Sequence, residues 1–194
     1  MNQPPPPSRQ LIVSENITVN GVIEFVDDWF HPDHHTDEEL LELQRQQMAT
    51  ETALILGRRT FKEFHAYWAD LPDDETGSTE HLNRIAKYLV TSTLTDPDWE
   101  NTTIIPPSSL IAEVQKLKSS GSGDLGITGS ITVVHALLEA DLVDEIRLFI
   151  YPVLTGQGRS LVPAGLPMRD LKLSSQQEFP SGVVFQSYTR QLTT

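Results

Sequence analysis

Short apolar runs along the chain alternate with segments in which apolar residues recur every three or four positions. Runs of strand length lie at 11–25, 52–57, 87–93, 102–105, 124–128 and 142–154, the first interrupted by an Asn-Gly turn. The segments 58–68, 108–120 and 129–141 have the period of an amphipathic helix instead. Strands that alternate with helices in this order predict a largely parallel sheet with helices on both faces.

The polar segment that follows the first strand contains the predicted start of a further helix. Thr36 and Glu39 form a capping-box pattern. Beyond it, five residues share one face of the predicted helix: Leu40, Leu41, Gln44, Gln47 and Met48. Residues 69–79 combine Pro, Gly and acidic residues, which predicts a loop and makes the segment a candidate lid.

The C-terminal segment has the pattern of a β-hairpin. Two extended runs, 171–179 and 182–192, flank a Pro-Ser-Gly turn. We therefore predict an α/β fold with three α/β/α layers, a mostly parallel mixed central sheet and a C-terminal antiparallel hairpin. It forms one domain over residues 11–194, preceded by a proline-rich tail at 1–10 that we expect to be disordered.

Composition narrows the range of functions. The 194 residues include 14 Lys+Arg, 27 Asp+Glu and no Cys, for a net charge of −13. The absence of cysteine excludes disulfides, thiolate nucleophiles and thiolate metal sites. The acidic charge argues against a nucleic-acid partner, and the apolar runs are too short to span a membrane, so we expect a cytoplasmic protein.

The negative charge is concentrated in one region. Residues 24–80 contain 15 acidic and four basic residues. One interpretation is a set of solvated loops and helix faces. The other is an acidic rim on a binding cleft that disfavours anionic substrates.

Two predicted strand-to-helix junctions are suited to binding phosphate. At both, a glycine lies at the start of a helix, where unpaired backbone N–H groups and the positive end of the helix dipole meet. The first junction is 57–60, with Arg58 and Arg59, and the second is 128–132, with Ser130. Neither matches a dinucleotide fingerprint or a Walker loop. Residues 156–159 are interpreted as a turn, with Arg159 as a lower-ranked contact.

No metal site is predicted. One cluster resembles metal ligands, and it consists of His31, Asp33, His34 and His35. Its spacing fits neither a helical ligand pair nor a zinc finger, and no remote third ligand stands out.

Four segments in this order resemble the dihydrofolate-reductase-like family, which includes the reductase domain of bifunctional riboflavin-biosynthesis deaminase-reductases. They are "ENITVNGVIE", "LILGRRTFKEF", "KYLVTSTL" and the long run from 123 to 161. The resemblance extends over about 11–190 and is strongest to stand-alone bacterial members. It implies the dihydrofolate-reductase-like fold and NADPH as hydride donor.

The resemblance also implies where the cofactor binds. Segment 57–60 would bind phosphate, and segment 128–132 would bind the pyrophosphate. Segment 91–93 would lie near the adenosine ribose and its 2′-phosphate, and the backbone at 19–21 would run alongside the nicotinamide. The implied cofactor residues are Val19, Asn20, Gly21, Gly57, Arg58, Arg59, Thr60, Thr91, Ser92, Thr93, Thr128, Gly129, Ser130, Ile131 and Thr132. Asn20 departs from the family, which carries Asp there.

Two carboxylates are candidate proton donors for a reduction. Dihydrofolate reductases use an acidic residue of the first helix, and here Asp37 lies at the corresponding helix start, with Glu24 as the second candidate. Water is a third source of the proton. An aromatic substrate pocket is expected from Trp29, Phe61, Phe64 and Trp68.

These features predict an NADPH-dependent oxidoreductase acting on a small, non-phosphorylated heterocycle, carbonyl or imine compound, because the acidic region offers few bases for a phosphate. The alternatives are 5-amino-6-(5-phosphoribosylamino)uracil reductase, dihydrofolate reductase, and a non-catalytic nucleotide-binding module. The resemblance implies a homodimer, for which we expect the apolar strand at 147–154 to be a shared sheet edge.

Overall fold

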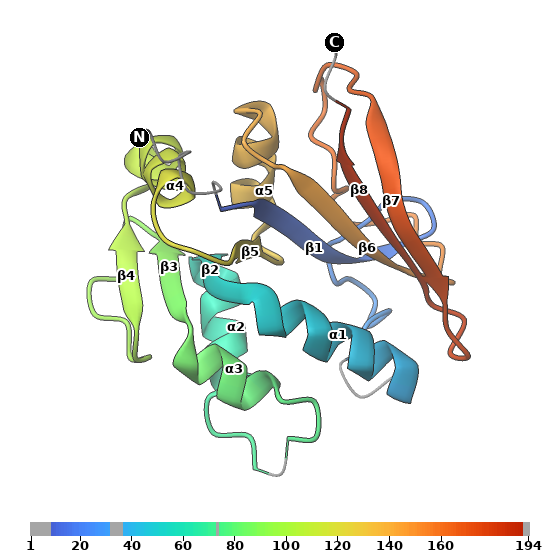
Figure 1. The fold of residues 1–194 in the computed structure, drawn as a ribbon, viewed down its shortest axis with the longest axis horizontal. Coiled ribbons are helices and arrows are strands. Elements are labelled where there is room, and N and C mark those ends of the chain that lie inside the picture. The colour runs from blue at the N-terminus through green and yellow to red at the C-terminus, as the bar shows by residue number, and fades with distance from the viewer. Residues whose placement is uncertain (1–8, 32–36, 73, 192–194) are drawn as a thin grey trace, which may run out of the picture.

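A mixed eight-stranded sheet forms the centre of the computed structural model, which describes residues 9–31, 37–72 and 74–191 (Figure 1). The strand order is β4-β3-β2-β5-β1-β6-β8-β7. The strands are β1 Leu11–Thr18, β2 Glu51–Gly57, β3 Ala86–Val90, β4 Thr102–Ile105, β5 Asp124–Ile127, β6 Glu145–Tyr151, β7 Leu171–Glu178 and β8 Val184–Arg190.

The six strands from β4 to β6 pair in parallel, whereas β8 and β7 are antiparallel. The C-terminal hairpin is thereby added to the end of a parallel sheet. This arrangement confirms the predicted α/β fold with a mostly parallel mixed sheet.

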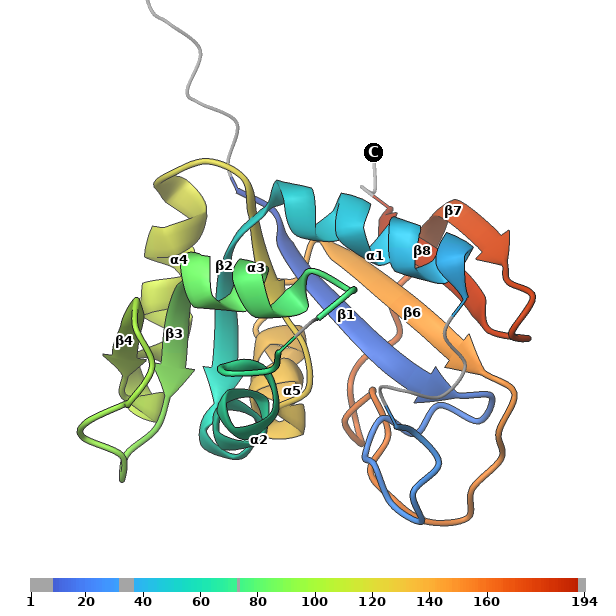
Figure 2. The same cartoon turned by 90° about the horizontal axis from the view of Figure 1, so that it is seen from below.

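Helices cover both faces of the sheet. They are α1 Glu38–Thr50, α2 Arg58–Trp68, α3 Ser78–Arg84, α4 Leu110–Ser119 and α5 Ile131–Glu139, with a short 3-10 turn at Pro107–Ser109. On one face, Val114 of α4 and Leu137 of α5 pack into the core formed by alternate residues of β1, β2 and β5. On the other, α2 and α3 pack on Leu54 and Leu56, and α1 crosses β1 and β6 (Figure 2).

Two of the predicted boundaries change. The first turn of α1 is capped by Asp37, whose carboxylate accepts from the Leu40 N–H at 2.9 Å, and Thr36 of the predicted capping box lies outside the described residues. The predicted loop 69–79 contains the beginning of α3, which the periodicity did not reveal because the helix has only seven residues.

A buried lysine supports the end of this short helix. Lys87 has no exposed surface, and its amine donates to the carbonyls of Leu82 at 2.6 Å and Ile85 at 3.1 Å. Burial lowers the pKa of the Lys87 amine to about 8. The amine binds carbonyls at the C-terminal end of α3, where a positive charge is favourable.

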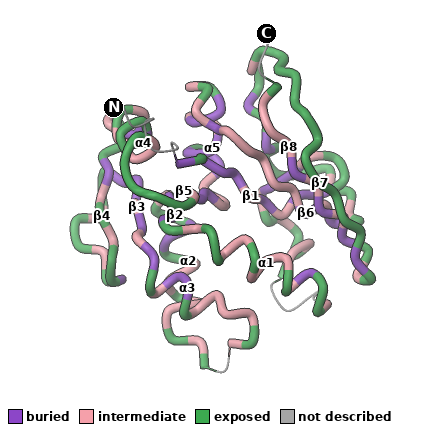
Figure 3. The backbone as a smooth tube through the Cα atoms, in the orientation of Figure 1, coloured by how far each residue is buried: buried purple, intermediate pink, exposed green. Residues whose placement is uncertain are grey.

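The apolar strand at 147–154 is not a sheet edge, which corrects the prediction. It forms β6, which lies between β1 and β8 and contributes Phe149 and Tyr151 to the core under α1. The edges of the sheet are β4 and β7, and every residue of β7 is exposed (Figure 3).

The N-terminal end of the described chain is anchored. Arg9 is buried, and its guanidinium donates to Thr52 Oγ1 at 2.7 Å. The preceding part of the predicted tail, residues 1–8, lies outside the described residues. No helix in the described part of the chain is long and apolar enough to cross a membrane.

Candidate active site

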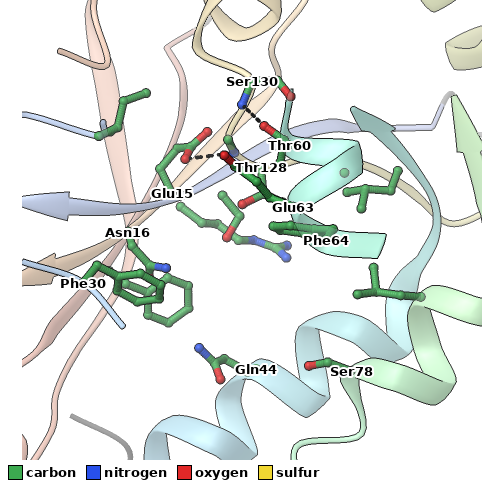
Figure 4. A pocket seen from close by; sticks show the side chains of 18 of the residues that line it. Glu15, Asn16, Phe30, Gln44, Thr60, Glu63, Phe64, Ser78, Thr128 and Ser130 are labelled. Atoms are coloured by element: carbon green, nitrogen blue, oxygen red, sulfur yellow. Dashed lines mark hydrogen bonds between the residues drawn. The ribbon is translucent and has the colours of Figure 1, made fainter. Parts of the chain in front are cut away.

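A cavity of about 750 Å³ lies between the sheet and the helices α1, α2 and α3. It runs from the carboxyl ends of β2 and β5 to their amino ends. Thr60, Thr128 and Ser130 lie at one end, Gln44 and Ser78 lie at the other, and Phe64 lies between them (Figure 4).

The two predicted phosphate junctions meet at the first end of the cavity. Residues 57–60 and 128–132 all line it. Side chains bind the junctions to each other: Gly57 N–H donates to Ser130 Oγ at 2.6 Å, and Ser130 N–H donates to Thr60 Oγ1 at 2.9 Å. Two strand-to-helix turns that are far apart in sequence therefore form one unit.

The backbone at the second junction leaves little room for side chains. Gly129 and Ser130 have φ values of +59° and +57°. A Cβ on Gly129 would lie 3.0 Å from the Thr60 methyl carbon, and one on Gly57 would lie 3.1 Å from Ser130 Oγ. The left-handed conformation of Ser130 costs roughly 1–2 kcal/mol for a residue with a Cβ, and the two hydrogen bonds of Ser130 hold it in place.

This end of the cavity has the features of an anion-binding site. Arg58 and Arg59 open α2, and Ile131 and Thr132 open α5, where first-turn N–H groups have no partner within the helix. Both positive helix ends face the same space. Among the described residues Arg58 forms no ion pair, whereas Arg59 is paired with Glu63 at 2.8 Å.

The other implied cofactor residues do not line this cavity. Thr91, Ser92 and Thr93 follow β3, where Thr91 Oγ1 accepts the N–H groups of Thr93 and Leu94, both at 3.2 Å. Segment 91–93 thus lies at the same edge of the sheet, beside the junctions.

The turn at 19–21 also lies outside the cavity lining. Asn20 Nδ2 donates to the Thr155 carbonyl at 2.7 Å, and Asn20 Oδ1 accepts from Thr18 Oγ1 at 3.0 Å. The amide thereby ties the turn to the loop after β6. A carboxylate could not donate the first of these bonds, which gives a structural reason for asparagine here.

The two predicted proton donors differ in position. Glu24 lines the cavity and forms an ion pair with Arg159 at 2.6 Å, which lowers the pKa of its carboxyl. Asp37 caps α1 and does not line the cavity. The pKa of the Asp37 carboxyl is lowered, because hydrogen bonds from Leu40 and Ser181 outweigh its partial desolvation.

Two of the four predicted aromatic residues line the cavity. These are Phe64 and Trp68, whereas Phe61 is in the core and the indole N–H of Trp29 donates to the Glu24 carbonyl at 2.9 Å. The structure adds five aromatic residues that the sequence reasoning missed: Phe25, Phe30, Tyr67, Phe149 and Tyr151. Tyr67 lies on α2, and the other four come from the loop after β1 and from β6, which no local sequence pattern brings together.

A buried glutamate, Glu15, was also missed. It is 3% exposed, lies on β1 and lines the phosphate end of the cavity. Glu15 Oε2 accepts from Gly129 N–H at 3.1 Å (Figure 4). Burial raises the pKa of this carboxyl to about 8. The available signal was the single charged residue in a predicted strand, at a position that alternates with Leu11 and Val13.

The far end of the cavity is acidic. Glu51 Oε2 lies 2.7 Å from His81 Nε2, within hydrogen-bond distance, and Asp124 accepts from Thr50 Oγ1 at 2.6 Å. Glu51, His81 and Asp124 all line the cavity. Amide side chains of α1, Gln44 and Gln47, complete this polar end.

Two cavity arginines come from outside the acidic region 24–80. They are Arg147 of β6 and Arg159 of the loop after it, so the base count of that region understated the positive charge of the site. Each is already paired, Arg147 with Glu145 at 2.7 Å and Arg159 with Glu24. The described residues contain no group of ligands that could hold a metal ion, and His34 and His35 lie outside them.

The chain belongs to the family of the RibD C-terminal domain, whose model matches residues 9–185. Over 186 residues it is 27% identical to the Bacillus subtilis protein YyaP, covering 91% of this chain and 92% of that protein.

Solved structures show the same fold. A pyrimidine reductase-like protein from Corynebacterium diphtheriae is 15% identical, with a TM-score of 0.66 and coverage of 95% of this chain and 93% of that one. Dihydrofolate reductase from Enterococcus faecalis, complexed with NADP(H), is 16% identical, with a TM-score of 0.60 and coverage of 94% and 96%. The fold is thus dihydrofolate-reductase-like, as the sequence resemblance implied.

Proposed function

We propose that the protein is an NADPH-dependent reductase of a small, flat, non-phosphorylated substrate. The observation that carries this proposal is the joining of two helix N-termini, at 57–60 and 128–132, at one end of a single cavity. The E. faecalis relative in fold is complexed with NADP(H), which supports a dinucleotide there. When bound, that cofactor would supply a hydride.

Different parts of the cavity would contact different parts of the ligands. Arg58 and the first turns of α2 and α5 would hold phosphate, and Phe64 and Trp68 would cover a flat ring beyond them. The acidic far end would bind hydrogen-bond donors of the substrate. Because Glu51 and Asp124 lie there and Arg147 is already paired, a neutral or cationic substrate fits better than a phosphorylated one.

A fluorescence titration of NADPH and NADH tests the cofactor part of the proposal. We expect NADPH to bind more tightly, and Arg58→Ala to weaken it by roughly 10- to 100-fold, as for the loss of a charged hydrogen bond. Arg84→Ala, on the far end of α3, is the control and should bind NADPH as the wild type does. Failure of the wild type to bind either dinucleotide would favour the non-catalytic nucleotide-binding module.

Consumption of NADPH with a panel of pteridines, quinones and imines tests the substrate part. The panel also contains 5-amino-6-(5-phosphoribosylamino)uracil. We expect turnover of a neutral or cationic member. Faster reduction of the phosphorylated pyrimidine than of every other compound would contradict the substrate class while leaving the reductase proposal intact.

A further inference from the structure

Glu15 occupies a gap in the sheet. β1 pairs with β5 only through Leu11, Ile12 and Val13, whereas its pairing with β6 continues to Thr18. Beyond Val13 the chain of β5 turns away into the junction at 128–130. Glu15 therefore has Leu148 of β6 on one side and the mouth of α5 on the other.

The two carboxyl oxygens of Glu15 have different surroundings. Oε2 accepts the N–H of Gly129, whereas Oε1 is buried and has no hydrogen-bond partner among the described residues. The raised pKa, about 8, means that the carboxyl is protonated at neutral pH. Because Oε2 already accepts a hydrogen bond, the proton belongs on Oε1, where it has no protein acceptor.

We propose that Glu15 is the proton donor of the reduction, with Oε1–H donating to the oxygen or nitrogen of the reducible C=O or C=N bond. This proposal rests on the proposed function. A bound dihydronicotinamide cofactor would supply the hydride that the substrate carbon accepts. The O–H bond of the Glu15 carboxyl breaks, its proton forms the new bond to the heteroatom, and the product is an alcohol or amine. Water then returns a proton to the Glu15 carboxylate.

The other acids of the cavity are poorly suited to this role. Glu24 is held ionised by Arg159, and Glu63 is paired with Arg59. Burial raises the pKa of the Tyr151 phenol to about 12, which makes it a weaker acid than Glu15. The carboxylate of Glu51 contacts His81 Nε2 at 2.7 Å, at the opposite end of the cavity.

A protonated carboxyl is also compatible with a neighbouring anion. Glu15 binds Gly129, which belongs to the proposed phosphate junction, and a charged carboxylate there would repel the cofactor. The charged and titratable groups that line the same cavity are Glu24, Glu51, Arg58, Arg59, Glu63, Tyr67, His81, Asp124, Arg147, Tyr151 and Arg159.

The first test needs neither cofactor nor substrate. A carbon-13 NMR titration of protein labelled at glutamate carboxyl groups should contain one resonance that titrates at about pH 8. That resonance should be absent from Glu15→Gln and present in Glu139→Gln, a control at an exposed position outside the cavity. A Glu15 resonance that titrates near the ordinary value of 4.5 would overturn the proposal.

The second test measures the hydride step in a single turnover with the first panel compound that the wild type reduces. We expect Glu15→Gln to lower its rate by roughly 10²- to 10⁴-fold, with NADPH affinity close to that of the wild type. The wild-type rate should fall tenfold per pH unit above about pH 8, and this decrease should be absent from the variant.

The outcomes separate the two proposals. A wild type that reduces a compound, together with a Glu15→Gln variant of unchanged rate and pH profile, overturns the role of Glu15 and leaves the reductase proposal standing. A wild type that binds NADPH but reduces no member of the panel, or that fails to bind it, overturns both. Glu139→Gln should match the wild type in every measurement.

Discussion

At the scale of the residue, burial of Glu15 affects folding as well as chemistry. The folded protein holds the proton of this carboxyl up to about pH 8, whereas an ordinary glutamate releases it near 4.5. Between these values the folded state binds more protons than the unfolded state. The contribution to stability is therefore fully present below the lower value and is lost as the pH rises through the window.

This loss predicts a pH-dependent difference between wild type and Glu15→Gln. The wild type should lose roughly 1.4 kcal/mol of unfolding free energy per pH unit relative to the variant, on the order of 5 kcal/mol across the window. Urea denaturation at pH values on either side of the window measures it. A difference between the two proteins that stays constant with pH would contradict the raised pKa.

A second residue-scale prediction concerns Gly129. Gly129→Ala should lower the unfolding free energy by about 1–3 kcal/mol, because its Cβ would crowd Thr60 in a left-handed backbone conformation. It should also weaken NADPH binding, because Thr60 Oγ1 would shift from Ser130 N–H.

The matched control is Gly156→Ala, where a Cβ would meet no atom within 4 Å. Surface changes of this kind usually alter stability by less than about 0.5 kcal/mol. If the two alanine variants unfolded at the same urea concentration, the close packing of the two junctions would be refuted.

At the scale of the element, the helices that could be predicted are those with a regular local pattern of apolar residues. α2 begins and ends where its periodicity placed it, because Gly57 ends a buried strand and the apolar side of the helix is regular. α3 was missed because seven residues are too few to show a helical period. Its ends are held by side chains instead: the Asp74 carboxylate accepts Thr79 N–H, and the Lys87 amine donates to the Leu82 carbonyl.

The order of the strands in the sheet and the direction of individual side chains could not be predicted from the sequence pattern either. The apolar character of β6 fits an interior strand as well as a covered edge, and only the pairing with β1 and β8 distinguishes them. In the same way, Asp37 lies at the helix start as expected, but its carboxylate accepts the N–H groups of Leu40 and Ser181 and does not face the cavity. Residues 57–60 and 128–132 could be found because glycine and hydroxyl groups at a strand-to-helix turn are local signals.

At the scale of the whole molecule, the cavity assembles charge from both halves of the chain. The acidic segment 24–80 supplies Glu24 and Glu51, and the second half supplies Arg147 and Arg159. The cavity is consequently far less acidic than the region that forms one of its walls. A count along the sequence could not show this, because ion pairs join residues more than a hundred positions apart, as Glu24 and Arg159 are.

The homodimer remains a prediction, and we expect its interface at the β7 edge of the sheet. β7 exposes all of its residues, with Leu171 and Leu173 at 42% and 44%, beside Met168 at 92%. An edge strand that pairs on one side only, here with β8, and carries exposed leucines is suited to pairing with a second copy. Light scattering should therefore give the mass of a dimer.

The variant Leu173→Lys tests this surface. A lysine on β7 should weaken the dimer and shift the scattering mass toward the monomer. NADPH binding should stay unchanged, because the proposed junctions follow β2 and β5 in the middle of the sheet, away from β7. Leu154→Lys, another exposed apolar residue outside β7, is the control. A monomeric wild type would rule out the dimer.

The hydrogen bonds of Ser130 to Gly57 and Thr60 are made by groups of the protein alone. A phosphate group arriving at this end would meet donors whose positions are already fixed, so little conformational entropy would be lost on binding. The strain in the Ser130 backbone is carried by the folding free energy of the whole domain and not by the ligand. Under the proposed function, affinity at this end is thus preorganised, and the side chains of α1 and α3 at the other end of the cavity could change without rebuilding the joined junctions.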